Sequence, residues 1–585
     1  MLENILLQVH KPGRYIGHEW NLPNKSFAKS DIKFALCFPD LYEIGMSNLG
    51  IRIIYAILNN LPDVVCERFF SPALDMEKVL RDKNLEIFSL ESRKGLKEFD
   101  FAGFSLGYEL GYTNVLNILE LGLVPLKSSM RGNNFPLVIG GGPCALNPEP
   151  MHDFFDLFLI GEAEEAILEI VDIYRKVKTE FKASKISKQD LLVMFSHVEG
   201  VYVPSLYEAR YSHEGKIEEL KAKCDNVPAK IKKRFVKDLN SAYFPSSWLM
   251  PYIQTVHDRI TLEIMRGCPN NCRFCQARVQ YFPFRQRGVE NILNLAQDAY
   301  KCTGYEEVSL CGLSVSDFSG LDELLKSLIS LFKKDAVSVS LPSVKPKTLI
   351  GEASSLIATI KKTGLTFAPE AGSERMREIL NKDFNTEEFF KVLQQAYACG
   401  YQNIKLYFMI GLPSEREEDL DGIIDLSAQA MELRRKSGKG PAQVNISVNT
   451  LVPKPHTPFQ WFKMEPIETM KYKQGYLKEK IKNRKIKLST HNPCMSFIEG
   501  VLSRGDRRLS QVILGAFKKG ARFDAWDNYF MFDGWMDAFK ESAIDPGFYL
   551  KDKSRDEFLP WDLLDVGISK EALLKESDKI IDRTR

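Results

Sequence analysis

The sequence predicts an α/β protein with a doubly wound N-terminal domain, a partial (β/α)6 barrel and a helical C-terminal extension. Three observations lead to this prediction: strands alternate with helical segments in the first third, a second alternating series follows, and the last part has helical spacing. At 585 residues the chain is also too long for one core. The expected parts are a domain over residues 1–180, a connector over 181–255, the barrel over 256–460 and the extension over 461–585.

The N-terminal domain is predicted from short apolar runs that are each followed by a helical segment. Such runs are IKFALCFP (32–39), FDFAGFSL (99–106) and PLVIGGGP (136–143), and their alternation with helices favours a parallel, Rossmann-like sheet. Gly140, Gly141 and Gly142 directly follow one of these strands, at the edge where such sheets bind ligands. Glycines let a backbone approach a phosphate or a flat cofactor closely, but a tight turn without a ligand explains them equally well.

Charge, hydropathy and cysteine usage bound the class of protein. The net charge of +2 gives no sign of a polyanionic partner, and no apolar stretch is long enough to span a bilayer. The start of the chain, MLENILLQVHKPGRY, lacks the order of a signal peptide. The 11 cysteines are an odd number and are scattered apart from one cluster, which argues against a secreted disulfide framework. We therefore expect a cytoplasmic protein.

That one cluster is RGCPNNCRFC (266–275), which places Cys268, Cys272 and Cys275 on a short loop. A structural zinc site takes four ligands, usually as two close pairs, and no second pair follows here. A four-iron cluster held by three thiolates fits this spacing better, because its fourth iron is then free for an exogenous ligand. The loop therefore predicts an iron–sulfur site with one open corner.

Alternating polar and apolar residues predict the barrel that follows this loop. In NIKLYFMIG (403–411), Lys405 and Tyr407 alternate with apolar neighbours, and QVNISVNT (443–450) repeats the pattern with Asn and Ser. A closed eight-stranded barrel fills its interior with branched apolar side chains, so a polar inner face indicates a wet or ligand-filled cavity in a partial barrel. An antiparallel sheet with one solvated face is the weaker alternative, because the crossovers are long and helical.

The spacing Cys-x-x-x-Cys-x-x-Cys, with Phe274 just before the last cysteine, resembles the radical S-adenosylmethionine (SAM) superfamily. The resemblance implies a [4Fe–4S] cluster held by Cys268, Cys272 and Cys275, whose open iron binds the amine and carboxylate of SAM. It implies that an electron from the reduced cluster cleaves SAM, and that the resulting 5′-deoxyadenosyl radical removes a hydrogen atom from the substrate. An electron donor such as flavodoxin or ferredoxin is implied as well.

The same resemblance implies further contacts to SAM. The cofactor-binding residues that it implies are Phe274, Gly312 in SLCGLSVSDF, Glu370 and Ser373 in APEAGSERM, and Lys405. An exposed acid at a helix start explains Glu370 without any function. If Lys405 points inward, burial without a counter-ion would be costly, which favours a partner such as the SAM carboxylate.

The N-terminal part resembles the cobalamin-binding domain at the front of many radical SAM enzymes. The matching words are SNLGIRIIY, FDFAGFSLGYEL and PLVIGGGPCALNPEP, and the whole chain is similar to a bacterial and archaeal family with such a domain. The Asp-x-His-x-x-Gly signature, which supplies a histidine to cobalt, is absent after the first strand. The resemblance thus leaves two alternatives open: cobalamin bound without that histidine, and a domain that has lost the cofactor.

Together these features predict a radical SAM enzyme that transfers a group, with methylation through cobalamin as one form of the reaction. A cobalamin-independent modification, such as methylthiolation or rearrangement, is the first alternative. The second is a non-catalytic, RNA- or ribosome-associated iron–sulfur protein, for which the basic stretch KYKQGYLKEKIKNRKIK (471–487) is the direct support. A solvated helix face is the favoured interpretation of that stretch. The sequence does not indicate whether the substrate is RNA, a protein or a small molecule.

Overall fold

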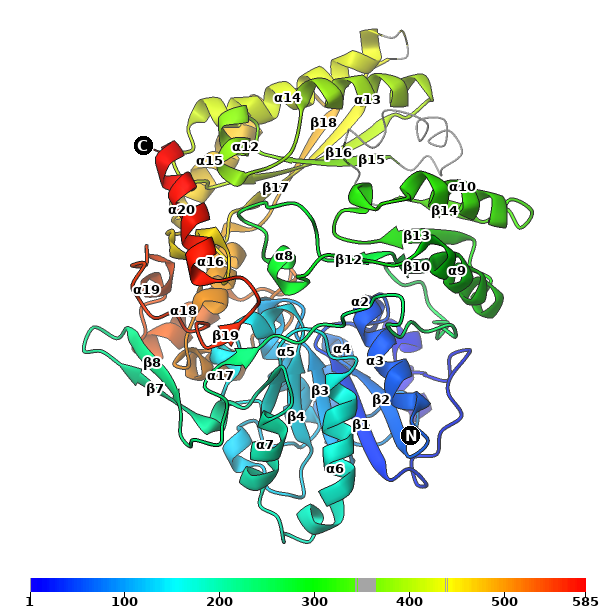
Figure 1. Cartoon of the computed structure of the whole chain (residues 1–585), viewed down its shortest axis with the longest axis vertical. Coiled ribbons are helices and arrows are strands. Elements are labelled where there is room, and N and C mark those ends of the chain that lie inside the picture. The colour runs from blue at the N-terminus through cyan, green and yellow to red at the C-terminus, as the bar shows by residue number, and fades with distance from the viewer. Residues whose placement is uncertain (1, 342–344, 346–363, 437, 439, 585) are drawn as a thin grey trace. The chain divides into compact units, whose positions relative to one another are not determined.

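The computed structural model describes residues 2–341, 345, 364–436, 438 and 440–584 (Figure 1). The chain folds into two compact units, each drawn from separated stretches of sequence. Unit 1 consists of Met1–Asp258, Val501–Tyr549 and Asp556–Gly567, and unit 2 consists of Arg259–Gly500, Leu550–Arg555 and Ile568–Arg585. Within the described residues, no helix combines the length and the apolar composition needed to cross a membrane.

Unit 1 is built on a six-stranded sheet with the order β2-β1-β3-β4-β5-β6. The strands are β1 (Ile32–Phe38), β2 (Val64–Phe70), β3 (Phe101–Ser105), β4 (Leu137–Gly141), β5 (Leu157–Leu159) and β6 (Val201–Tyr202). The first five are parallel and β6 is antiparallel to β5. The helices between them include α3 (Leu49–Asn60), α4 (Leu74–Asp82), α5 (Tyr112–Leu121) and α6 (Ala166–Lys182). Almost every residue of β1 is buried, as expected for a parallel strand with helices on both faces. The predicted doubly wound sheet is confirmed.

The predicted connector and part of the predicted extension also belong to unit 1. The connector forms the antiparallel hairpin β7 (Tyr207–Tyr211) and β8 (Ile217–Ala222), and β9 (Ile231–Lys232) pairs with β19 (Leu564–Asp565). Two helices from the C-terminal third, α17 (Leu509–Lys518) and α18 (Phe532–Glu541), lie in the same unit. The units are therefore not consecutive along the chain, and the four boundaries read from the sequence remain predictions.

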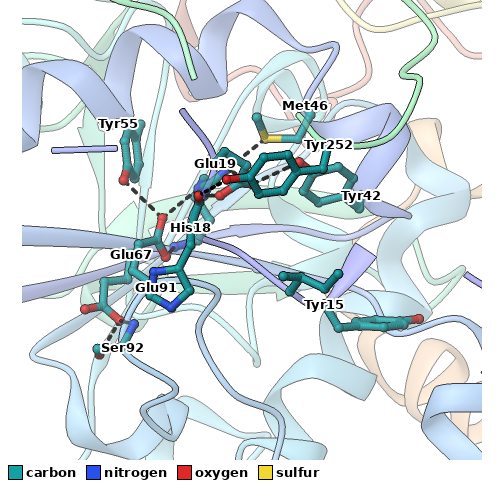
Figure 2. A network of polar contacts seen from close by, with 12 residues as sticks. Tyr15, His18, Glu19, Tyr42, Met46, Tyr55, Glu67, Glu91, Ser92 and Tyr252 are labelled. Atoms are coloured by element: carbon teal, nitrogen blue, oxygen red, sulfur yellow. Dashed lines mark hydrogen bonds and ion pairs between the residues drawn. The ribbon is translucent and has the colours of Figure 1, made fainter. Parts of the chain in front are cut away.

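A buried network of charges fastens the N-terminal segment of unit 1 to β2 (Figure 2). The carboxylate of Glu19 lies 2.7 Å from the guanidinium of Arg68, and their side chains are only 2% and 1% exposed. Arg68 also contacts Glu91 at 2.7 Å, while Tyr42 and Tyr55 donate hydrogen bonds to the two carboxylates. Because each of these buried charges has partners, the network holds the segment in place without leaving an unpaired ion.

The described residues of unit 2 include two parallel sheets, with the orders β10-β13-β14 and β15-β16-β17-β18. The strands are β10 (Ile260–Glu263), β13 (Glu307–Cys311), β14 (Ser338–Ser340), β15 (Leu365–Glu370), β16 (Asn403–Ile410), β17 (Gln443–Thr450) and β18 (Ile486–Thr490). Helices α9 (Val289–Thr303), α10 (Leu321–Phe332), α13 (Thr386–Ala398), α14 (Glu417–Lys436) and α15 (Ile467–Lys480) alternate with them (Figure 1). This alternation confirms the α/β class. Among the described residues the two sheets share no strand pair, so these strands form no closed barrel.

The second sheet has one apolar and one polar face, as the alternation in the sequence predicts. Ile404, Leu406 and Phe408 of β16 are buried, and they join a core with apolar residues of α13 and α14. The residues between them are more exposed, and β17 repeats this pattern, with Val444, Ile446 and Val448 buried. Burial of one parity anchors the strands to the helices and leaves the other face for polar side chains.

One element differs from the prediction for the final third. The favoured interpretation of the basic stretch 471–487 is a solvated helix face, but α15 ends at Lys480 and β18 begins at Ile486. Residues Ile486 to Thr490 pair in parallel with β17, from Val444 to Val448. The alternation of Ile486 and Leu488 with polar residues suits an edge strand. Pairing with the sheet therefore determines the structure of this segment, and its basic composition does not.

Candidate functional site

The three cysteines lie on the loop between β11 (Met265–Arg266) and α8 (Gln276–Gln280). β11 pairs antiparallel with β12 (Arg285–Gln286), and this pairing holds the two ends of the region together. Gly267 opens the loop with a φ of 78°, and a Cβ at this position would lie 2.8 Å from the Cα of Phe284. Only glycine tolerates both the conformation and the close approach, so the backbone fixes where the cysteines begin.

The thiols are half-buried and suit a cluster better than a single metal ion. Burial raises the pKa of Cys272 to about 11 and also raises the pKa of Cys275, so a bound metal would be needed to keep both as thiolates at neutral pH. In the part of the chain that the structure describes, no three His, Cys, Asp or Glu side chains converge closely enough to hold one metal ion. A mononuclear zinc site needs such convergence, whereas in a four-iron cube each thiolate binds its own iron.

Glu370 and Lys382 are brought to the cysteine loop. Glu370 ends β15, where the register with β16 shifts, and its φ of 68° is unusual for a residue with a side chain. Its Oε1 lies 3.2 Å from Lys382 Nζ, and both side chains are largely buried. Burial lowers the pKa of Lys382, but the charges of Glu370 and Cys272 outweigh this effect and raise it. Lys382 is therefore a cation beside the thiols, and the interpretation of Glu370 as an exposed acid is wrong.

Ser373 has a structural role in the described fold. It precedes α12 (Glu374–Leu380), where its Oγ accepts a hydrogen bond from the backbone N–H of Met376 at 3.3 Å and donates one to Asp419. This is the arrangement of a helix N-cap. A contact between Ser373 and SAM stays a prediction, because the cap alone accounts for a serine at this position.

Packing likewise accounts for Phe274 and Gly312. Phe274 packs half-buried against a core cluster that includes Met376 and Phe459. A Cβ on Gly312 would lie 2.4 Å from Met265 Cγ, so a larger residue would collide with the strand that leads into the cysteine loop. Their contacts to SAM remain predictions. Both residues shape the walls around the loop.

Lys405 lies on the predicted face of β16, but it is exposed. Its Nζ lies 4.7 Å from the centre of the Tyr407 ring, a cation–π contact at the surface of the sheet. Because the Lys405 side chain is exposed, burial gives no reason for it to have a ligand partner. Binding of the SAM carboxylate by Lys405 stays a prediction without support from burial.

Three polar residues around the loop were missed by the sequence analysis. The side chain of Asn270 contacts Cys268 Sγ at 3.2 Å and Asp317 at 2.7 Å, and Lys345 contacts both Asn270 and Asp317. Of these residues, only Asn270 has a signal in the sequence, since it stands between Cys268 and Cys272. Asp317 and Lys345 come from later segments, and nothing in their spacing indicates that they meet the loop.

A pocket of about 270 Å³ adjoins the loop on the side of the last helix, α20 (Lys570–Thr584). Cys272 and Cys275 line it together with Leu573 and Glu576 of α20. The Nε of Arg273 lies 2.9 Å from the Glu576 carboxylate, so an ion pair ties the helix to the loop. The end of the chain thus forms one wall beside the predicted cluster ligands.

In unit 1, packing of the chain on itself explains two of the three predicted ligand-binding glycines. A Cβ on Gly140 would lie 2.6 Å from the Phe158 ring, and one on Gly142, whose φ is 104°, would lie 2.9 Å from the Leu106 carbonyl. Gly141 has free space, with its nearest neighbour, Leu159, at 3.8 Å. The triplet is therefore mainly a packing feature, and its binding of a cofactor stays a prediction.

The ligand-binding crevice of a doubly wound sheet lies where the strand order reverses, here between β1 and β3. Residues 523–526 of unit 1 bond to this place: Trp526 Nε1 donates to Asp40 at 3.1 Å, and Phe523 N–H donates to Asn114 at 2.9 Å. Asn114 in turn donates to the carbonyl of Pro39, which follows β1. This edge does not fit a flat cofactor such as cobalamin, because Trp526 and Phe523 already bond to its polar groups, those of Asp40 and Asn114.

Two protein-family profiles match the chain. The sequence profile described as "Radical SAM superfamily" matches residues 262–427, which include Cys268, Cys272 and Cys275. A second profile, "Radical SAM proteins, N-terminal", matches residues 50–204. The chain belongs to the radical SAM superfamily. As a radical SAM protein it uses a [4Fe–4S] cluster and SAM as cofactors, and it requires a reductant and a substrate.

Three relatives show how far the likeness of this radical SAM protein extends. An uncharacterised protein of Methanocaldococcus jannaschii is 28% identical over 512 residues, which cover 87% of this chain and 97% of the relative. The ribosomal protein uS12 methylthiotransferase RimO of Pelotomaculum thermopropionicum is 26% identical over 33% of this chain and 44% of its own length. The tRNA-2-methylthio-N(6)-dimethylallyladenosine synthase of Ruegeria sp. is 26% identical over 28% of this chain. The chain thus spans 44% and 39% of the two methylthiotransfer enzymes.

Two solved radical SAM enzymes align with the chain at low sequence identity. The methyltransferase TsrM from Kitasatospora setae aligns with a TM-score of 0.47 at 12% identity, covering 73% of this chain and 74% of TsrM. The cobalamin-dependent enzyme OxsB aligns with a TM-score of 0.47 at 13% identity, covering 95% of this chain and 80% of OxsB. Neither likeness is close enough to carry a residue's role to this chain.

Proposed function

We propose that this chain is a radical SAM enzyme that binds one [4Fe–4S] cluster through Cys268, Cys272 and Cys275 and carries out a group transfer. The observation that carries the proposal is the position of these three cysteines on one loop of unit 2, inside the matched segment. When bound, the cluster supplies the electron that cleaves SAM to methionine and the 5′-deoxyadenosyl radical. No fourth cysteine lies on the loop, which leaves one iron for SAM.

The surrounding residues support this assignment through charge and shape. Lys382 places a cation beside Cys272, and a positive charge stabilises thiolates that carry iron. Tyr407, Asn445 and Ser447 lie half-buried on the polar face of β16 and β17. We assign substrate binding to this face, because its side chains can form hydrogen bonds with a ligand, whereas the opposite face is apolar and packs in the core.

An anaerobic reconstitution tests the proposal. The purified chain should take up about four irons and form 5′-deoxyadenosine from SAM when dithionite is added. Replacing Cys268, Cys272 or Cys275 by Ala should abolish both, whereas the exposed Cys224 replaced by Ala should retain both. A wild-type chain that holds a cluster but forms no 5′-deoxyadenosine, or that binds a single zinc ion, contradicts the proposal.

Methylthiolation is the second candidate reaction; SAM would supply the methyl group and the radical, and a sulfide-level co-substrate would supply the inserted sulfur. It is supported by the partial similarity to RimO and to the tRNA methylthio-synthase, which covers about a third of this chain or less. Product analysis with isotopically labelled SAM against cell extract separates the candidates. A label that enters the product as a methylthio group favours this reaction, and a methyl group without sulfur favours methylation.

Cobalamin as the methyl carrier requires a rearrangement of unit 1. TsrM and OxsB are described with cobalamin, but in this chain Trp526 and Phe523 bond to the crevice between β1 and β3. Binding there would have to displace both contacts. We therefore favour a cobalamin-independent reaction, with flavodoxin or ferredoxin as the natural electron donor.

The non-catalytic alternative depends on the basic stretch around α15. Lys473 contacts Glu415 at 2.8 Å and Lys480 contacts Asp421 at 3.2 Å, so part of its positive charge is already neutralised within unit 2. An RNA-associated role stays a prediction. Salt-dependent RNA binding that persists in a triple cysteine variant would favour it over the enzyme.

A further inference from the structure

The side chain of Asn270 makes a hydrogen bond to one of the predicted cluster ligands. Its Nδ2 lies 3.2 Å from Cys268 Sγ and 2.7 Å from Asp317 Oδ2. A primary amide has two N–H donors, and here one points to the sulfur and the other to the carboxylate. The amide therefore has enough donors to serve the sulfur and the carboxylate at once.

The orientation of this amide is fixed by the charges around it. Lys345 Nζ lies 2.8 Å from Asn270 Oδ1, on the opposite side of the amide from the sulfur and the carboxylate. A flipped amide would turn its oxygen toward Cys268 and Asp317 and its N–H groups toward the ammonium of Lys345. Each of these contacts would be repulsive, so only the orientation that donates to sulfur satisfies the network.

Asp317 and Lys345 are themselves held by neighbouring groups. Asp317 lies in the short helix η8 (Val315–Asp317) that follows β13, and Ser314 Oγ donates to its Oδ2 at 2.6 Å. Lys345 contacts Asp317 Oδ1 at 3.1 Å, and its backbone N–H donates to Ser316 Oγ at 2.8 Å. The segment after β13 thus holds Asp317 and Lys345 in place, and these two residues fix the orientation of the Asn270 amide.

We propose that Asn270 is a positioning residue that donates an N–H···S hydrogen bond to the cluster ligand Cys268 and thereby raises the cluster's reduction potential. This inference rests on the proposed function, in which Cys268 binds iron. Reduction adds one electron, and thus one negative charge, to the iron–sulfur core. A hydrogen bond to sulfur stabilises the more negative state more strongly, so it favours uptake of the electron. Asp317 and Lys345 act through Asn270.

Potentiometric titration of the reconstituted full-length chain, followed by electron paramagnetic resonance, tests the inference with dithionite as reductant. Asn270→Leu should shift the midpoint potential to more negative values at unchanged iron content. Asn271→Leu is the matched control, because Asn271 is an exposed asparagine on the same loop, and it should leave the potential unchanged. Equal potentials for wild type and Asn270→Leu, or equal shifts for both variants, would overturn the inference.

The wild type offers a measurement that needs no variant. With asparagine side chains labelled with 15N, the reduced cluster should show a hyperfine coupling to the amide nitrogen of Asn270, and its absence would overturn the inference even if Asn270→Leu does not fold. Asp317→Leu separates positioning from charge, because leucine leaves no acceptor for the Asn270 amide. Loss of a nearby negative charge alone raises the potential, whereas release of the Asn270 amide lowers it, and we expect the lower value. A wild type without any cluster would instead count against the proposed function.

Discussion

At the scale of single residues, the buried carboxyl groups of this chain are of two kinds. Some form ion pairs, and others have no ion pair within the described residues to offset the cost of burying their charge. Glu370 near the cysteines faces Lys382, whereas Asp524 in unit 1 accepts side-chain hydrogen bonds from two neutral groups, those of Thr113 and Trp535. Its burial is not offset by an ion pair, although Arg522 lies near enough to lower the pKa somewhat. Asp524 is thus a candidate for a measurable effect of pH on stability.

We predict that Asp524 makes unit 1 less stable as the pH rises through about 6. Burial raises the pKa of Asp524 to about 6, above its ordinary value of 3.8, so between these values the folded state binds more protons than the unfolded state. The stabilisation is complete below the unfolded pKa and is lost as pH rises through the folded pKa, with a size on the order of 3 kcal/mol. Urea unfolding at several pH values measures it.

Asp524→Asn should remove this part of the pH dependence, while Asp533→Asn, at an exposed position of α18, should keep it. The quantity to compare is the difference in unfolding free energy between each variant and wild type at each pH, because other carboxylates titrate in both proteins. A difference for Asp524→Asn that does not change between about pH 4 and pH 7 would contradict the assignment.

At the scale of elements, the polar–apolar alternation of a strand and the face that it buries could be predicted from the sequence. Strand pairs and side-chain contacts between distant parts of the sequence could not. The alternation in 403–411 and 443–450 correctly placed Lys405 and Asn445 on the polar face, because parity is a local property of a strand. The strand β18 was missed, because its basic surroundings resemble a solvated helix and its pairing with β17 is not local. The contact of Asp317 and Lys345 with the cysteine loop was also missed, because these residues lie far from the loop in the sequence.

Helix α20 gives the next prediction, since it packs on the core beside the cysteine loop. Ile580 is completely buried in a cluster with Met376 and Phe459, while its neighbour Ile581 is only half-buried. Ile580→Ala should destabilise this region by about 2–5 kcal/mol through the cavity that it leaves, and Ile581→Ala should cost clearly less. Hydrogen exchange of the amides in α12 and α20 reports the local effect.

The same pair of variants links packing to the cofactor. Because α20 forms a wall of the pocket that Cys272 and Cys275 line, a loosened helix exposes the cluster to solvent and oxygen. Reconstituted Ile580→Ala should lose its iron faster in air than Ile581→Ala does. Equal rates of loss and equal exchange in the two variants would show that α20 does not protect the loop.

At the scale of the whole molecule, the path of the chain determines which parts can work alone. Unit 1 takes residues from three separated stretches, and so does unit 2, so a cut near residue 258 yields neither unit complete. The segment 501–549 matters most here, because it supplies α17, α18 and the residues that bond to the edge of the N-terminal sheet. A sequence read in order does not show that residues 501–549 and 556–567 return to the unit that begins the chain, so the predicted boundaries stay predictions.

This return leads to the last prediction, that the wild-type chain does not bind cobalamin at the crevice of unit 1. Trp526 donates to Asp40 and Phe523 donates to Asn114 at the carboxyl end of β1, so a corrin ring would have to displace two hydrogen bonds and an aromatic side chain. Adding the chain to aquacobalamin should therefore leave the visible spectrum unchanged. Trp526→Ala removes one contact, and any weak binding should appear first in this variant, whereas the exposed Trp20 replaced by Ala should behave as wild type. Stoichiometric binding by the wild type would mean that residues 523–526 leave the crevice in solution, and would return methylation through cobalamin to first place among the reactions.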